Sequence, residues 1–118
     1  MAKDRKQGKR GLNIIIVGCG KVGASLTEQL YKEGHDITLV DRSSERLQVL
    51  TDMYDVMGIV GNGASYKIQR EAGIDNADLM IAVTDSDELN LLCCTVAKRV
   101  LPPVDFTPWH SGQLKSLR

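Results

Sequence analysis

A run of branched apolar residues leads straight into closely spaced glycines, and this feature constrains the fold of the chain most. The stretch reads "IIIVGCGKVGASL" over residues 14–26, and its continuous β-branched start predicts a strand buried on both faces. Gly18, Gly20 and Gly23 follow with GxGxxG spacing at the start of a helical pattern. There the first glycine permits a tight turn, the second lets backbone approach a pyrophosphate, and the third lets helix and strand pack closely. A purely structural glycine turn is the alternative.

Strand and helix patterns alternate along residues 12–100. Strands are predicted at residues 12–17, 36–41, 56–60 and 79–83, and each is followed by apolar residues at helical spacing. Gly34 and Gly73 are placed to end the first and third helices. Four βα units in succession predict an α/β fold of the Rossmann-like, doubly wound type, in which helices cover both faces of a parallel sheet.

Two of the helices begin at residues typical of caps. Ser43 or Ser44 is placed to cap the second helix, and Asp85 is placed to cap the last one, with Glu88 as its capping-box partner. The last helix is expected to bury Leu89, Leu92, Cys93, Val96 and Val100. Its apolar residues, Leu91 and Leu92 among them, exceed what one helix face buries. We expect part of this surface either to pair with a second subunit or to join the core.

The two ends of the chain differ from the middle. Residues 1–11 are basic and lack the apolar segment of a secretory signal, so a disordered leader is expected there. Residues 12–100 are expected to form one Rossmann-like domain, with the glycine loop described above as its nucleotide-binding segment. Three prolines interrupt residues 101–118, where we expect an irregular tail, truncated or non-native, in place of a fifth strand.

Composition and charge exclude several classes of function. Fifteen basic residues balance fifteen acidic ones and only 4% of residues are aromatic, which argues against a nucleic-acid module. No apolar run approaches the roughly 20 residues that span a bilayer, so no membrane insertion is expected. The three cysteines lack CxxC or Cys/His spacing. They predict no metal site and are typical of reduced thiols in a cytoplasmic protein.

An acidic residue stands where a ribose would meet the glycine loop. Asp41 ends the second predicted strand, 18 residues after Gly23, close to the spacing of the carboxylate that binds a ribose. A carboxylate accepts from both ribose hydroxyls and repels a 2′-phosphate. Lys21 and Arg42 add positive charge nearby, and Arg42 is a candidate to stack on adenine, with a solvated arginine as the alternative.

Loops after the third and fourth predicted strands complete the expected crevice, because the carboxyl ends of parallel strands meet at one edge. Asn62 and Gly63 follow the third strand, where turn formation is an equal alternative to ligand contact. Thr84 and Asp85 follow the fourth strand.

The sequence shows no catalytic set. Hydride transfer needs an acid or base beside the nicotinamide, but His35 lies in a helix-to-strand turn away from the carboxyl ends and His110 lies in the tail. We therefore expect a site that binds and does not catalyse.

Longer segments resemble a known family. "NIIIVGCGKVGASLTEQL", "ITLVDRSSERLQVL", "IVGNGA" and "EAGIDNADLMIAVTDSDELNLLCCTVAK" occur in order across residues 12–99. They resemble the KTN/RCK (TrkA N-terminal) nucleotide-binding domain of Trk-type potassium-uptake regulatory proteins. The family's next strand finds no match after Arg99. By this resemblance the ligand contacts are Gly18, Cys19, Gly20, Lys21, Val22, Gly23, Asp41, Asn62, Gly63, Thr84 and Asp85.

The resemblance also implies a role. Family domains bind NAD(H) or ATP/ADP and form dimers or larger rings at the inner face of the cell membrane. There they regulate the membrane subunit of a Trk-type potassium transporter, because ligand changes the shape of the assembly. NAD(H) is the expected ligand here, with ATP/ADP as the alternative. The competing interpretation of the chain is the cofactor-binding fragment of an NAD-dependent dehydrogenase.

Overall fold

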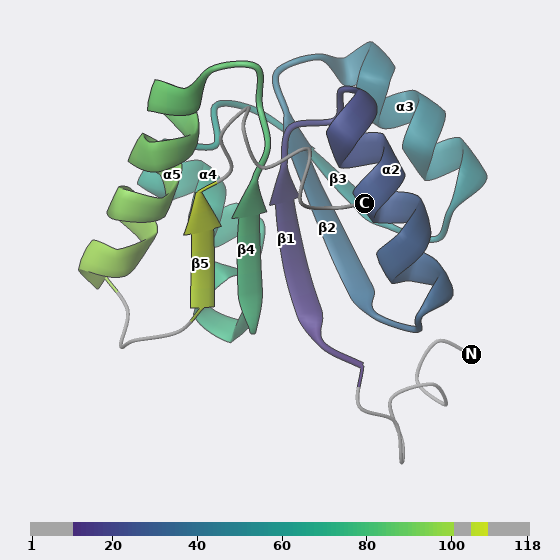
Figure 1. The fold of residues 1–118 in the computed structure, drawn as a ribbon, viewed down its shortest axis with the longest axis horizontal. Helices are drawn as coiled ribbons and strands as arrows, with labels where there is room; N and C mark the ends of the chain where they lie inside the picture. The colour runs from purple at the N-terminus through teal and green to yellow at the C-terminus, as the bar shows by residue number, and fades with distance from the viewer. Residues whose placement is uncertain (1–10, 101–104, 109–118) are drawn as a thin grey trace.

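Five parallel strands form one sheet in the order β3-β2-β1-β4-β5 (Figure 1). A computed structural model describes residues 11–100 and 105–108 of the chain. The elements are β1 (Asn13–Val17), α2 (Lys21–Lys32), β2 (Asp36–Asp41), α3 (Ser44–Met53), β3 (Met57–Val60), α4 (Tyr66–Glu71), the short 3₁₀ helix η1 (Ile74–Asn76), β4 (Leu79–Ala82), α5 (Asp87–Val100) and β5 (Asp105–Pro108). Among these residues, no helix is long and apolar enough to cross a membrane.

The branched run of β1 lies at the centre of the sheet, between β2 and β4. Ile14 and Ile16 face the layer that contains α2 and α3, whereas Ile15 and Val17 face the layer that contains α4 and α5. All four side chains are at most 3% exposed, as expected for a strand that is covered on both faces. The predicted α/β, doubly wound architecture is confirmed.

The chain reverses its direction of travel across the sheet beside β1. From β1 it moves outward through β2 to β3, and then crosses back to place β4 on the other side of β1. Such a switch point leaves a crevice at the carboxyl ends of the strands.

Two glycines end helices as predicted. Gly34 and Gly73 follow α2 and α4 with φ angles of 93° and 90°, a left-handed conformation that costs glycine little. Ser43 is the residue that caps α3, since its side chain accepts a hydrogen bond from the Arg46 N–H.

The expectation of an irregular tail without a fifth strand is wrong at residues 105–108. These residues form β5, which pairs in parallel with β4 from Leu79↔Asp105 to Ala82↔Pro108. Pro108 is tolerated because it ends an edge strand. The expected disordered leader, apart from Gly11, and the rest of the expected tail lie outside the described residues.

The start of α5 also differs from the prediction. Ser86 caps this helix, because its Oγ accepts from the Leu89 N–H at 3.0 Å; Asp85 lies one residue too early. The Ser86 hydroxyl in turn donates to Glu88 Oε1 at 3.3 Å, so Glu88 contacts the actual cap.

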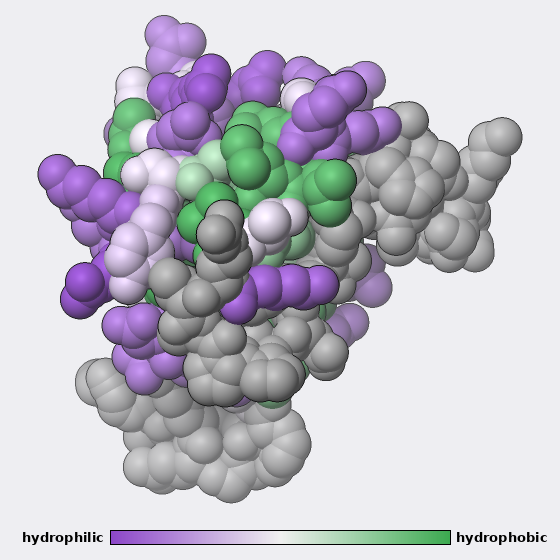
Figure 2. All heavy atoms as spheres, turned by 90° about the vertical axis from the view of Figure 1, so that its left-hand side faces the viewer, coloured by the Kyte–Doolittle hydropathy of each residue, from purple (hydrophilic) through white to green (hydrophobic). Residues whose placement is uncertain are grey.

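The buried face of α5 agrees with the prediction at Cys93, which is buried, and at Leu89, which packs against the core, but not at Leu92. Leu92 is 50% exposed, whereas the buried residues are Asn90, Cys93, Cys94 and Ala97. The Asn90 amide sets this register, because its Oδ1 accepts from the Thr84 N–H at 2.8 Å. On the side of the molecule that contains α5, Figure 2 shows an apolar area bordered by polar side chains. The burial of the Val100 side chain lies outside the described residues.

Candidate nucleotide-binding site

The glycine loop joins β1 to α2, and glycine stands at each of its three positions for a different structural reason. Gly18 has a φ of 109°, which favours glycine. A Cβ on Gly23 would overlap the carbonyl oxygen of Gly18, so only glycine allows α2 to approach β1 this closely. Gly20 has ordinary backbone angles, and the nearest atom to its hypothetical Cβ is Arg46 Nη1 at 3.8 Å. Gly20 is therefore bare toward open space.

Asp41 fixes the position of this loop. Its Oδ2 accepts from the Cys19 N–H at 2.6 Å, and its Oδ1 accepts from the Ser43 N–H at 2.8 Å. A carboxylate oxygen has more than one acceptor direction, so the carboxylate is able to hold the loop and also accept from a ligand. The partly exposed Asp41 side chain faces the cavity described next.

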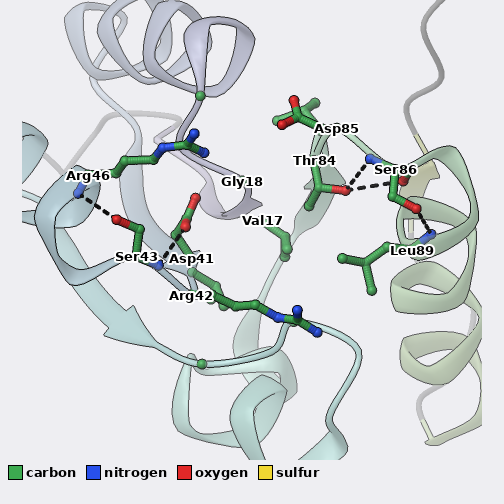
Figure 3. Close-up of a pocket in the computed structure, with 15 residues that line it drawn as sticks. Val17, Gly18, Asp41, Arg42, Ser43, Arg46, Thr84, Asp85, Ser86 and Leu89 are labelled. Carbon is green, nitrogen blue, oxygen red and sulfur yellow. Dashed lines mark hydrogen bonds between the residues drawn. The ribbon is translucent and has the colours of Figure 1, made fainter.

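A cavity of about 400 Å³ lies at the carboxyl ends of the strands. Seven of the predicted site residues line it: Gly18, Gly20, Asp41, Arg42, Gly63, Thr84 and Asp85. Figure 3 shows Asp41 on one side of this pocket and Thr84 with Asp85 on the other. Its volume falls within the range of small-molecule sites.

The other predicted residues do not line the cavity: Cys19, Lys21, Val22, Gly23 and Asn62. The side chain of Asn62 accepts from the Ala64 N–H at 2.9 Å, which is turn formation, one of the two alternatives for this residue. Lys21 begins α2 and is exposed.

Sequence reasoning missed several lining residues. Ser43, Arg46, Gly61, Ser86 and Leu89 all border the cavity. The position of Arg46 in the sequence could have indicated that it lies near the site, since it is in the first turn of the helix that follows Asp41. Gly61 and Ser86 belong to the two loops that were expected to complete the crevice, whereas Ser43 and Leu89 follow only from how the chain closes around it.

The Thr84 side chain is held by α5. Thr84 Oγ1 donates to Asn90 Oδ1 at 2.6 Å, and Asn90 Nδ2 donates to the Thr84 carbonyl at 3.2 Å. Asn90 is fully buried, so this contact fixes the β4–α5 loop against the helix.

The charged lining residues are Asp41, Asp85, Arg42 and Arg46. Figure 3 shows the two arginine side chains on either side of Asp41. The formal charges cancel, and guanidinium groups beside bare backbone favour phosphate oxygens.

The thiols are unsuited to nucleophilic chemistry. Burial raises the pKa of Cys19 to about 12, and the Asp41 carboxylate acts in the same direction. Burial also raises the pKa of Cys93 and of Cys94 to about 11. Since the thiolate is the reactive form, all three remain inert thiols at neutral pH.

His35 lies at the opposite end of the sheet. Its Nδ1 accepts from the Leu12 N–H at 3.0 Å, just before β1 begins. Among residues 11–100 and 105–108, no group of three or more His, Cys, Asp or Glu residues is arranged to hold a metal ion.

Comparison with known proteins identifies the domain. A family model described as the TrkA-N domain matches residues 14–106. The chain belongs to the TrkA-N family. The match extends into β5, which agrees with the strand found there.

Relatives of this TrkA-N domain include whole potassium uptake proteins. The chain is 48% identical over 83 residues to the "Trk system potassium uptake protein TrkA" of Haemophilus influenzae, covering 70% of this chain and 18% of that protein. It is 37% identical over 90 residues to the TrkA homolog of Methanothermobacter thermautotrophicus, covering 76% of this chain and 42% of that protein. The chain thus spans about a fifth to two fifths of the length of these relatives.

Solved structures share the fold of this TrkA-N domain. The TrkA-N domain of the inner membrane protein ybaL from Escherichia coli has a TM-score of 0.74 at 22% identity, over 81% of this chain and 70% of that one. The Kef C-terminal domain of Shewanella denitrificans, described in AMP-bound form, has a TM-score of 0.70 at 20% identity, over 80% and 56%. The NAD(P)-binding domain of an exopolyphosphatase-related protein from Archaeoglobus fulgidus has a TM-score of 0.72 at 17% identity, over 89% and 79%.

Proposed function

We propose that this TrkA-N domain binds an adenine nucleotide and through it regulates a potassium uptake system. The observation that carries the proposal is the shared cavity of Gly20 and Asp41. Bare backbone at a helix N-terminus suits a pyrophosphate, and a carboxylate suits the hydroxyls of a ribose. NAD(H) is the proposed ligand and ATP/ADP the alternative. The fold neighbours described as AMP-bound and as NAD(P)-binding support this class of ligand.

The role in potassium uptake is proposed from the relatives, which are named as Trk system potassium uptake proteins. The proposed partner is the membrane subunit of a Trk-type transporter, which would hold the full-length protein at the cytoplasmic face of the membrane. Leu91 and Leu92 of α5 are 59% and 50% exposed. They are the proposed contribution of this domain to a homodimer or larger ring.

Regulation requires that ligand favours one arrangement of domains over another. It does so only through different affinities for the two arrangements, and a coupling of roughly 1–3 kcal/mol per site is typical. The cavity is bordered by loops from both halves of the sheet, so a bound nucleotide would contact both.

Binding is tested by titration calorimetry with NADH, NAD, ATP and ADP. At least one should bind saturably to the native domain. Gly20→Val should abolish binding, because its side chain fills the space that a pyrophosphate needs. The matched control is Ser25→Val, which introduces the same valine side chain at an exposed position of α2. No heat of binding for any of the four with folded native protein would contradict the proposal.

The dehydrogenase alternative is tested by following NADH absorbance with the domain and a panel of small carbonyl metabolites. The proposal expects NADH to be bound and not consumed. Stoichiometric oxidation of NADH would replace the regulatory function with the dehydrogenase one.

A further inference from the structure

Arg46 extends from the first turn of α3 toward the glycine loop (Figure 3). The backbone of Arg46 is held at the start of α3, because its N–H donates to Ser43 Oγ at 3.2 Å. Its Nη1 lies 3.8 Å from the point that a Cβ on Gly20 would occupy. The guanidinium therefore reaches the edge of the pocket at which the backbone of the loop is bare.

Asp41, which lines the same pocket, does not form an ion pair with this guanidinium. The two Asp41 oxygens accept from the backbone N–H groups of Cys19 and Ser43. Within the described part of the chain, the ion pairs are Lys32–Glu28 and His35–Glu33. The charge of Arg46 is thus available to a ligand in the cavity that it lines.

The opposite side of the same edge is the beginning of α2. Gly20 is the N-cap and provides no side-chain hydrogen bond, and the first turn of α2 contains no acidic residue. The first N–H groups of a helix lack intrahelical partners. Donors from two separate elements, the α2 backbone and the Arg46 guanidinium, thus converge on one edge of the pocket.

We propose that Arg46 binds a phosphate group of the nucleotide at this edge, and so makes the site selective for phosphorylated ligands. This inference rests on the proposed nucleotide-binding function. An arginine fork beside backbone N–H groups matches phosphate geometry. The phosphate is a 5′-phosphate, because a 2′-phosphate would lie against the Asp41 carboxylate and be repelled.

The test measures the affinities of adenosine, AMP, ADP, NADH and NADPH for the native domain and for Arg46→Gln. Losing a charge-assisted hydrogen bond should weaken AMP, ADP or NADH by about tenfold or more, while adenosine is unchanged. AMP and ADP separate the first 5′-phosphate from the second. Arg46→Lys should lie between, since it keeps the charge and loses the fork.

Arg70→Gln is the matched control. Arg70 is exposed on α4, with its guanidinium 5.7 Å from the centre of the Tyr66 ring, and does not line the cavity. It should leave every affinity unchanged.

Two outcomes overturn the role of Arg46 while leaving nucleotide binding intact. One is an unchanged affinity for every phosphorylated ligand, and the other is an equal loss for adenosine, which would mean a structural role. Weakening of NADPH alone would overturn the 5′ assignment. If the folded native domain binds none of the ligands, the proposed function itself fails.

Discussion

The carboxylate of Asp41 accepts a hydrogen bond from the backbone N–H of Cys19, with 2.6 Å between Oδ2 and the nitrogen. This contact joins the end of β2 to the glycine loop that follows β1. The other carboxylate oxygen of Asp41, Oδ1, accepts from the N–H of Ser43 at the start of α3. One side chain thus positions two of the segments that form the pocket and also lines the cavity between them.

Asp41→Ala should weaken NADH binding on the order of tenfold or more, because hydrogen bonds to a charged group are lost at roughly 1.5–3 kcal/mol each. It should also lower the melting temperature, since two backbone N–H groups lose their acceptor. Calorimetric titration and thermal denaturation measure the two effects. The native domain should prefer NADH to NADPH; equal affinities, or an unchanged NADH affinity in the variant, would contradict the role of Asp41.

The glycine loop should respond unequally to added methyl groups. Gly23→Ala should lower the free energy of unfolding by about 3 kcal/mol or more, because its Cβ overlaps the backbone of Gly18. Gly20→Ala should cost under about 1 kcal/mol, since its Cβ meets only a flexible arginine. Urea denaturation of both variants measures the difference. Similar losses would mean that the close approach of α2 and β1 is not as described.

Capping of α5 distinguishes two neighbouring residues. Ser86→Ala should lower the free energy of unfolding by about 1 kcal/mol, because the Leu89 N–H loses its acceptor. Asp85→Ala should change it by less than about 0.5 kcal/mol. The same denaturation measurement compares them, and a larger loss at Asp85 would restore the cap expected from the sequence.

The raised pKa of a buried thiol leads us to expect that the domain loses stability at alkaline pH. Burial raises the pKa of Cys94 from 9.0 to about 11, so above pH 9 the unfolded chain releases this proton before the folded one does. The stabilisation is therefore complete below about pH 9 and is lost as pH rises toward 11. Other groups titrate in this range too, so the comparison is with Cys94→Ala.

Between pH 8 and pH 10.5, the free energy of unfolding should decrease more for the native chain than for Cys94→Ala. Equal slopes would show that the thiol of Cys94 titrates alike in both states.

The parts of the fold that follow from local pattern were predictable. The β2 strand matches its expected bounds, and Gly34 and Gly73 end their helices, because periodicity and left-handed backbone are both visible in the sequence. The β5 strand was not predictable, since "DFTP" has little strand character of its own and forms by pairing along β4. Leu92 was misplaced because the register of α5 depends on the contact between Asn90 and Thr84.

The candidate site divides in the same way. Gly20 and Asp41 carry motif spacing, so the sequence located them correctly in the cavity. Arg46 is an ordinary charged residue on a polar helix, and only the packing of α3 beside the glycine loop brings it there. Lys21 lies next to Gly20 in sequence but does not line the cavity, because adjacent positions at a helix start point in different directions.

The most direct test of the central claim is to identify the nucleotide that co-purifies with the protein. Native protein and Gly20→Val are purified in parallel, denatured, and their supernatants analysed by mass spectrometry. We expect an adenine nucleotide, NAD(H) or ATP/ADP, from the native protein, and far less of it from the variant. Equal amounts from both, or no nucleotide from the native protein together with no binding of added NADH or ATP, would contradict nucleotide binding in this pocket.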